Sequence, residues 1–270
     1  MIEKIKNYYP NVGQSWGIVG IAIVSMLLFS PLNYALNKIV GRELSFLIYY
    51  LVAMGVPFVL AHFLRKKETG VTEYNFGNAS TKLMAFLIIT IIAIQTGIVM
   101  PIINLVPMPE FMQEIFLEFA QQDGLFSFIA IVIAAPVIEE LIFRGIILDG
   151  LLKKYSPAKS IILSSVLFGI VHLNPWQFIS ALIVGVFSGW VYYKTRKLSL
   201  SILIHAANNL FAFAMVYFMS SETMMSESLT DMYGGALNMF LITVGAILIS
   251  LLGFYLLRKE FSNSKRLRAW

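Results

Sequence analysis

The sequence has 270 residues, of which 58% are hydrophobic and 13% charged, and its mean hydropathy is +0.78. Ordinary soluble domains carry about twice that share of charge. A soluble domain of this size cannot bury so much apolar surface, which excludes a cytosolic enzyme, a disordered chain and a small secreted scaffold. The lack of cysteine excludes a disulfide framework, a thiol nucleophile and a Cys-ligated metal site. The composition therefore indicates an integral membrane protein.

Eight stretches of the sequence are long and apolar enough to cross about 30 Å of hydrocarbon as helices. They are, in chain order, residues 16–36, 44–64, 83–105, 125–148, 158–173, 177–193, 198–219 and 237–257. The fifth and sixth are short and only Asn174-Pro175-Trp176 separates them, so they fit either two full spans or one shallow hairpin. Without repeats or long linkers, the sequence predicts an all-α polytopic bundle of about eight transmembrane helices, in a single membrane domain over 1–270.

The basic residues predict the orientation of this bundle. If both termini are cytoplasmic, 17 of the 20 Lys and Arg residues lie in cytoplasmic segments, Lys38 and Arg42 lie outside, and Arg144 lies within a span. The charged residues of the outer loops 106–124 and 220–236 are all acidic. This bias follows the positive-inside rule. The net charge of +5 therefore reflects a multi-pass protein of the cell membrane, with the lipid bilayer as its partner and no nucleic acid.

Ionisable residues within the spans mark a candidate site. A charge at the bilayer centre costs roughly 2.5–3.5 kcal/mol on insertion scales, so it needs a reason. The fourth stretch holds three charged residues, Glu139, Glu140 and Arg144. Two of the three histidines, His172 and His205, also lie within spans. The charged and polar groups are thus confined to the region between residues 139 and 209.

Helical spacing predicts which of these groups face one another. Glu140 and Arg144 are four residues apart and can form an ion pair, and His205 is likewise four residues from Asn209. Glu139 is rotated by about 100° from Glu140, so it is the carboxylate left for chemistry. Counted from the nearest cytoplasmic cations, Glu139 and His172 lie about 20 Å deep and His205 about 12 Å deep. Three helices thus place polar groups in one slab, which suits a water-containing cavity.

Two kinds of chemistry fit such a set. A carboxylate and an imidazole can bind water and remove its proton, and a second imidazole with an amide can stabilise an oxyanion. Alternatively, Glu139, His172 and His205 could form a His₂Glu zinc set, although the sequence has no HExxH motif. A purely structural interpretation is also open, in which an ion-pair cluster and interhelical hydrogen bonds lock the helices together. The joint occurrence on three helices favours a functional site.

The three motifs resemble those of a known family. Glu139-Glu140-x-x-x-Arg144, Phe168-x-x-x-His172 and His205-x-x-x-Asn209 occur in the order found in the CPBP family. These are the CAAX-protease and bacteriocin-processing intramembrane endopeptidases, also called the Abi family. The resemblance covers residues 125–219 closely, which would be the catalytic core, and the remaining spans fit only as additional helices.

The resemblance implies an intramembrane protease that cleaves a membrane-associated peptide or protein. Glu139 would activate water with help from His172, while His205 and Asn209 would stabilise the oxyanion. Glu140 and Arg144 would order the site. The family is described both as metalloproteases, which here would place zinc on Glu139, His172 and His205, and as metal-free glutamate proteases. We favour the mechanism without a cofactor. The short loops and the lack of cysteine indicate a bacterial protein, whose substrates would be pheromones, bacteriocins or membrane regulators rather than prenylated proteins.

Two other functions compete with the protease. Intramembrane Glu and His residues also serve as proton relays, so the chain could be a proton-coupled transporter. Transporters usually show repeats and broken helices in both halves, and here the polar groups occupy one region only. The chain could also be a non-catalytic relative that acts as an immunity protein or as a membrane regulator. The intact motifs argue against that reading.

The orientation can be tested with reporter fusions. We expect reporters placed after Lys67, Lys154, Lys197 and at the C-terminus to lie in the cytoplasm, because the basic segments stay inside. Reporters near Glu114 and Glu227 should lie outside. A cytoplasmic reporter at Glu227 would contradict the eight-span topology.

Overall fold

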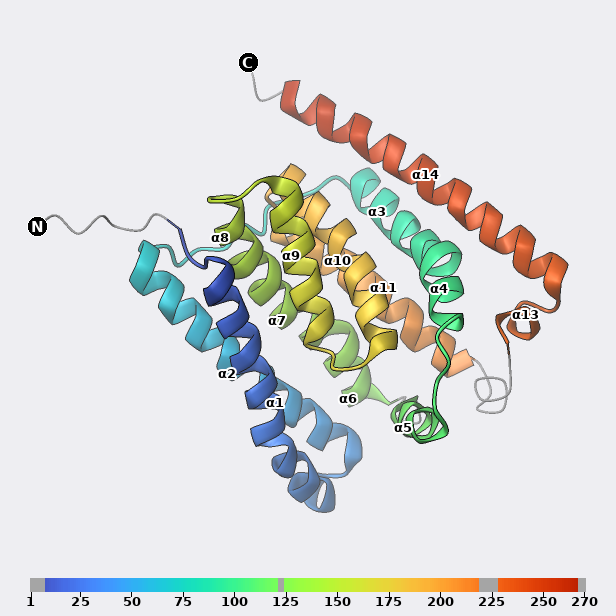
Figure 1. The fold of residues 1–270 in the computed structure, drawn as a ribbon, viewed down its shortest axis with the longest axis horizontal. Helices are drawn as coiled ribbons and strands as arrows, with labels where there is room; N and C mark the ends of the chain where they lie inside the picture. Colours follow the sequence, from blue (N-terminus) through green and yellow to red (C-terminus); the bar gives the residue numbers. More distant parts are fainter. Residues whose placement is uncertain (1–7, 121–123, 219–227, 267–270) are drawn as a thin grey trace, which may run out of the picture. The chain divides into compact units, whose positions relative to one another are not determined.

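The computed structural model describes residues 8–120, 124–218 and 228–266, and these residues form helices without a strand. The elements, shown in Figure 1, are α1 (Val12–Val40), α2 (Arg42–Thr69), α3 (Thr81–Ile94), η1 (Gln95–Val99), α4 (Met100–Asn104), α5 (Glu110–Ala120), α6 (Leu125–Phe128), η2 (Ile129–Ala134), α7 (Ala135–Glu140), η3 (Leu141–Leu148), α8 (Asp149–Leu152), α9 (Pro157–Ile170), α10 (Pro175–Thr195), α11 (Leu198–Phe218), α13 (Leu229–Met232) and α14 (Ala236–Arg266). The elements η1, η2 and η3 are π-helical. The predicted all-α polytopic membrane protein is confirmed.

Seven helices among the described residues are long and apolar enough to cross a membrane. They match seven of the eight predicted stretches. The exception is the fifth, 158–173, which forms the 14-residue helix α9. At about 1.5 Å per residue, α9 reaches only about 21 Å, which is less than the hydrocarbon thickness. Helix α9 packs directly against α10, so this pair forms an antiparallel helical hairpin of unequal arms.

Local capping explains why α9 is short. Ser156 accepts a hydrogen bond from the backbone of Lys159, and Pro157 occupies the first helical turn, so the chain starts α9 at this point. At the other end, Leu173 adopts a φ of 58°, which stops the right-handed helix. Asn174 then caps α10 by accepting from the backbone N–H of Gln177.

The chain divides into two compact units. The first comprises the described residues up to 77 and from 124 to 202, and the second comprises those from 78 to 120 and from 203 onward. The boundary falls within α11, whose first residues belong to the first unit. The prediction of a single membrane domain stays a prediction.

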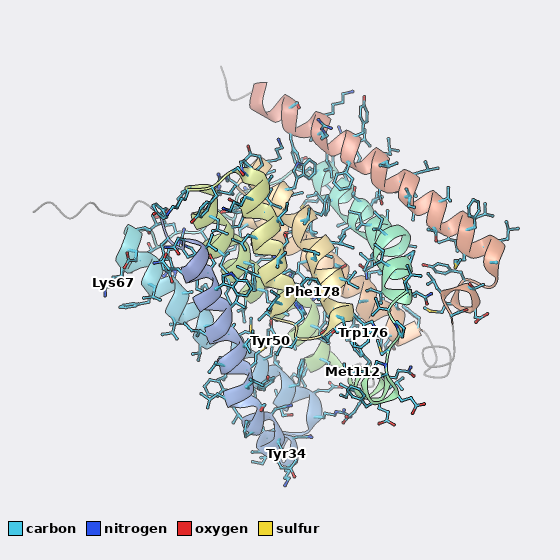
Figure 2. The ribbon with its side chains drawn as sticks, viewed as in Figure 1. Tyr34, Tyr50, Lys67, Met112, Trp176 and Phe178 are labelled. Carbon is cyan, nitrogen blue, oxygen red and sulfur yellow. The ribbon has the colours of Figure 1, made fainter. Side chains whose placement is uncertain are left out.

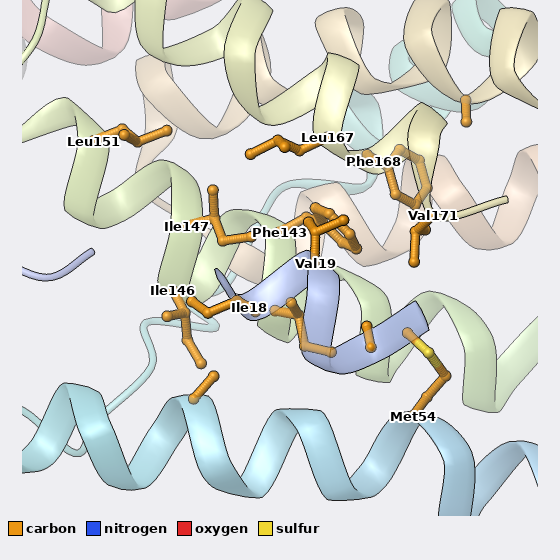
Figure 3. Packing of buried hydrophobic residues seen from close by; sticks show 14 of the residues in the cluster. Ile18, Val19, Met54, Phe143, Ile146, Ile147, Leu151, Leu167, Phe168 and Val171 are labelled. Carbon is orange, nitrogen blue, oxygen red and sulfur yellow. The ribbon is translucent and has the colours of Figure 1, made fainter. Parts of the chain in front are cut away.

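The core of the first unit forms around η3. Residues 142–148 are all buried, as expected for a helical segment that is enclosed on every side. Phe143, Ile146 and Ile147 pack with Ile18 of α1 and Phe168 of α9 in one apolar cluster (Figure 3). The segment that carries Arg144 is therefore enclosed by the other helices of this unit.

In the second unit, small residues let α14 pack closely against α3 and η1. A Cβ atom at Gly97 would lie 2.8 Å from the Cβ atom of Ala246, and one at Gly253 would collide with the Thr90 side chain. Close approach at small residues is typical of helices that pack within membranes.

Candidate active site

The two glutamates lie at the end of α7, between two π-helical segments. Pro136 explains the first of these, because a proline ring clashes with the carbonyl of the residue four positions earlier, here Val132 in η2. The same pattern recurs at Pro101, which follows η1. π-helical turns inside α-helices occur frequently at functional sites. The periodicity of the sequence did not indicate these distortions.

Glu140 and Arg144 form the ion pair that their spacing predicted. Arg144 Nη1 donates to Glu140 Oε1 over 2.9 Å, and both side chains are fully buried. Ser188 Oγ of α10 donates to the second oxygen, Glu140 Oε2, over 3.2 Å. Arg144 Nη2 donates to the backbone carbonyl of Gly185 over 3.1 Å. The pair is therefore attached to α10 through both of its members.

Gly185 leaves room for this arrangement. A Cβ atom at position 185 would lie 3.2 Å from Arg144 Nη2 and 3.0 Å from the Cβ atom of Ser165. The absence of a side chain thus lets the guanidinium reach the backbone of α10. Gly185 and Ser188 were not among the site residues predicted from the sequence.

Phe168 connects the ion pair to His172. The guanidinium carbon of Arg144 lies 4.7 Å from the centre of the Phe168 ring, which is a cation–π contact. The same ring meets the His172 imidazole edge-on, with 5.2 Å between ring centres and 81° between ring planes. Arg144, Phe168 and His172 therefore form a continuous row of contacts from η3 to the end of α9.

The hydrogen bond of His172 shows which ring nitrogen carries a hydrogen. Its Nδ1 lies 2.8 Å from the backbone carbonyl oxygen of Phe168. A carbonyl oxygen can only accept, so Nδ1 carries a hydrogen, and the neutral tautomer with this bond has its lone pair on Nε2. His172 is therefore arranged to accept a hydrogen bond from water through Nε2.

Glu139 faces a different helix from Glu140. Its Oε1 accepts a hydrogen bond from the Tyr50 hydroxyl of α2 over 2.6 Å, and the residue is 7% exposed. Tyr50 projects from α2 in Figure 2. Adjacent glutamates thus turn toward α2 and α10 respectively, as expected from a rotation of about 100° per residue.

Sequence reasoning missed Tyr50. The residue lies 89 positions from Glu139, so no spacing rule connects the two. The available signal was weak: a tyrosine in an apolar span needs a hydrogen-bond partner for its hydroxyl.

His205 and Asn209 lie on α11, in the second unit. His205 is 4% exposed. The first turn of α11 belongs to the first unit and is attached there, because the backbone N–H of Leu198 donates to the carbonyl of Asn75 over 2.7 Å. The approach of His205 and Asn209 to Glu139 and His172 stays a prediction.

The zinc alternative requires three ligands in one place. Across the described ranges, no three His, Asp or Glu side chains gather closely enough to hold one metal ion. The zinc alternative stays an untested prediction, and the proposed reaction is assigned to the protein's own side chains.

Comparison with known proteins identifies the segment that carries the motifs. A family model described as "Type II CAAX prenyl endopeptidase Rce1-like" matches residues 121–211. The uncharacterized protein YyaK of Bacillus subtilis is 28% identical over 87% of this chain and 78% of its own length. No solved structure matches the chain.

Two further relatives match a shorter segment. YdiL of Bacillus subtilis, which is described as a candidate membrane peptidase, is 32% identical over 31% of this chain and 34% of its own length. The UPF0177 protein YxdF of Lactococcus lactis is 35% identical over 29% of this chain and 44% of its own length. The family model spans all three motifs, from Glu139 to Asn209. The resemblance to the CPBP family is thus confirmed, and residues 121–211 are the segment that is similar to the type II CAAX prenyl endopeptidases.

Proposed function

We propose that the protein is an intramembrane endopeptidase in which Glu139 and His172 activate the attacking water. The observation that carries this proposal is the separation of the two adjacent carboxylates. Arg144 pairs with Glu140, whereas Glu139 accepts a hydrogen bond from the neutral Tyr50 hydroxyl. This hydroxyl fixes the orientation of the Glu139 carboxylate, which suits Glu139 to act as the base in proton transfer.

The reaction begins with a water molecule between Glu139 and His172. The carboxylate of Glu139 takes one proton, and the Nε2 lone pair of His172 accepts a hydrogen bond from the other O–H. The oxygen then attacks the carbonyl carbon of the scissile peptide bond, and its electron pair forms the new C–O bond. His172 thus orients the water, and Glu139 is the base.

Collapse of the tetrahedral intermediate completes the hydrolysis. Negative charge develops on the former carbonyl oxygen, where His205 and Asn209 donate hydrogen bonds. The C–N bond breaks as Glu139 returns its proton to the leaving nitrogen. Water has then been divided between the new carboxyl and amino termini, and the site is restored.

The substrate is a membrane-associated peptide or protein. Glu139 lies within the membrane-spanning run Leu125–Leu152, so the scissile bond has to enter the bilayer. The relatives above come from bacteria. This origin favours peptide pheromones, bacteriocins or membrane regulators as substrates. The distribution of basic residues favours a cell membrane location with both termini in the cytoplasm.

The first test separates the two glutamates. Glu139→Gln keeps the size and hydrogen-bonding capacity of the side chain but removes the base, so cleavage should fall by about 10²–10⁴-fold with little change in melting temperature. Glu140→Gln leaves the buried Arg144 charge without its carboxylate partner. Removing one partner of a buried ion pair destabilises a protein by roughly 3–5 kcal/mol. This second variant should melt early or accumulate poorly.

The double variant Glu140→Gln/Arg144→Gln is the matched control, because it leaves no charge stranded and should recover part of the stability. Melting temperature in detergent and the single-turnover cleavage rate are measured for all variants. If Glu139→Gln cleaves normally while Glu140→Gln is folded but inactive, the two roles are reversed.

A second test concerns Tyr50 as a positioning residue. Tyr50→Phe removes the hydroxyl that holds Glu139, a hydrogen bond to a charged group worth roughly 1.5–3 kcal/mol. We expect kcat to fall by about tenfold or more with KM nearly unchanged, because the orientation of the base is lost rather than substrate binding.

Tyr49→Phe provides the matched control one residue away on α2. Its hydroxyl donates to the backbone carbonyl of Met26 over 3.1 Å and does not touch Glu139. This variant should keep its activity. Equal kcat values for Tyr50→Phe and the unmodified protein would refute a positioning role.

The third test addresses the metal. Glu139, His172 and His205 come from three separate helices without a compact two-histidine motif, so we expect activity to survive chelation and the purified protein to lack stoichiometric zinc. Metal content and cleavage rate are measured before and after chelator treatment. One zinc ion per chain, lost together with activity and restored with it, would defeat the metal-free mechanism.

A further inference from the structure

A polar pocket of about 310 Å³ lies within the first unit, apart from the residues proposed for catalysis. It forms where the last residues of α2 and α10 meet α8 and the segment that precedes α3. Its polar lining includes Arg65, Tyr74, Asp149, Lys153, Tyr192 and Arg196. The proposed reaction uses none of these side chains.

The charges that face the pocket leave an excess of one cation. Three basic side chains line it, together with the carboxyl-bearing residues Glu73 and Asp149. Asp149 pairs with Lys153 over 2.8 Å and with Arg196 over 3.3 Å. Lys153 and Arg196 thus share the single carboxylate of Asp149, which cannot neutralise both of them.

Arg65 is the buried cation of this pocket. It is 5% exposed, and its Nη2 donates to the backbone carbonyl of Glu73 over 3.1 Å. Its guanidinium carbon lies 4.6 Å from the centre of the Tyr74 ring. Within the described part of the chain, no carboxylate forms an ion pair with Arg65, and its Nη1 has no hydrogen-bond partner. Burying a cation without a counter-ion is costly, which points to an anionic ligand.

The wall beside Arg65 is a fixed structure. The Tyr74 hydroxyl lies 2.8 Å from His62 Nδ1, and the Tyr74 ring packs so closely on Gly145 that a Cβ atom there would lie 2.9 Å from it. Burial raises the pKa of Tyr74, so its hydroxyl stays neutral. The pocket is therefore built before any ligand arrives.

We propose that this pocket binds a phosphodiester, supplied by the headgroup of a membrane phospholipid. Guanidinium groups match the oxygens of a phosphate, and a phosphodiester carries the single negative charge that balances the excess cation. The pocket also lies at the ends of membrane-spanning helices, where basic pockets between helices take lipid headgroups. A free phosphate ion offers the same oxygen atoms and is the second possible source.

The experiment compares three charge-neutralising variants of the full chain in detergent. Arg65→Gln removes the buried cation, and Arg196→Gln removes a partly exposed one, whose side chain is 45% exposed. Lys66→Gln is the matched control, because it removes the same charge from an exposed position next to Arg65. Native mass spectrometry measures retained phosphatidylglycerol, and the melting temperature is measured with and without inorganic phosphate.

We expect the unmodified protein and Lys66→Gln to retain the lipid alike. Arg65→Gln and Arg196→Gln should each retain it less, by about tenfold for the buried arginine, since charged hydrogen bonds to the phosphate are lost. If phosphate raises the melting temperature but no lipid is retained, and both arginine variants abolish that rise, the anion is free phosphate.

Two outcomes overturn the proposal. One is that neither probe binds the unmodified protein, and the other is that both probes bind Arg196→Gln as well as they bind Lys66→Gln. If Arg65→Gln fails to fold, the comparison of Arg196→Gln with Lys66→Gln decides alone.

Discussion

The buried ion pair between Glu140 and Arg144 is the interaction on which the first unit depends. Two charges inside a membrane-spanning helix are tolerated only where protein groups replace water. Arg144 donates a hydrogen bond to the carbonyl of Gly185 and lies over the ring of Phe168. Glu140 accepts a hydrogen bond from the hydroxyl of Ser188. Because these partners lie on α9 and α10, the hairpin of these helices must pack against η3 for the charges to be stable. The pair therefore holds the helix that carries the proposed base in a defined orientation.

The ion pair also gives the neighbouring carboxylates of Glu139 and Glu140 different roles. The pair occupies Glu140 and turns it toward α10, and the helical rotation then turns Glu139 toward Tyr50 of α2. Glu139 thus accepts a hydrogen bond from a tyrosine hydroxyl, while the adjacent Glu140 forms the ion pair with Arg144. The row of contacts from Arg144 through Phe168 extends the same constraint to His172, whose Nδ1–H bond leaves Nε2 to accept. The Glu140–Arg144 ion pair therefore helps to orient both Glu139 and His172, which the proposed reaction needs.

Local rules account for what the sequence predicted correctly. The spans follow from apolar run length, and the Glu140–Arg144 pair follows from a spacing of four residues within one helix. The rest depends on contacts between distant segments. Tyr50, Gly185 and Ser188 become relevant only once α2 and α10 are packed, and the length of α9 is decided by its caps rather than by hydropathy. The π-helical segments preserve the pairing although they break the periodicity from which it was predicted.

The depth of Glu139 connects the proposed chemistry to the bilayer. Asp149, which lines the polar pocket, follows Glu139 by ten residues in one helical run, or about 15 Å along its axis. If the pocket lies at the level of the lipid phosphates, about 5–7 Å outside a hydrocarbon layer of about 30 Å, Glu139 lies roughly 8–10 Å inside that layer. Water is scarce at that depth, so hydrolysis requires groups that hold a water molecule in place. A carboxylate fixed by Tyr50 and an imidazole with an available lone pair meet that requirement, and a bound lipid would keep them at a constant depth.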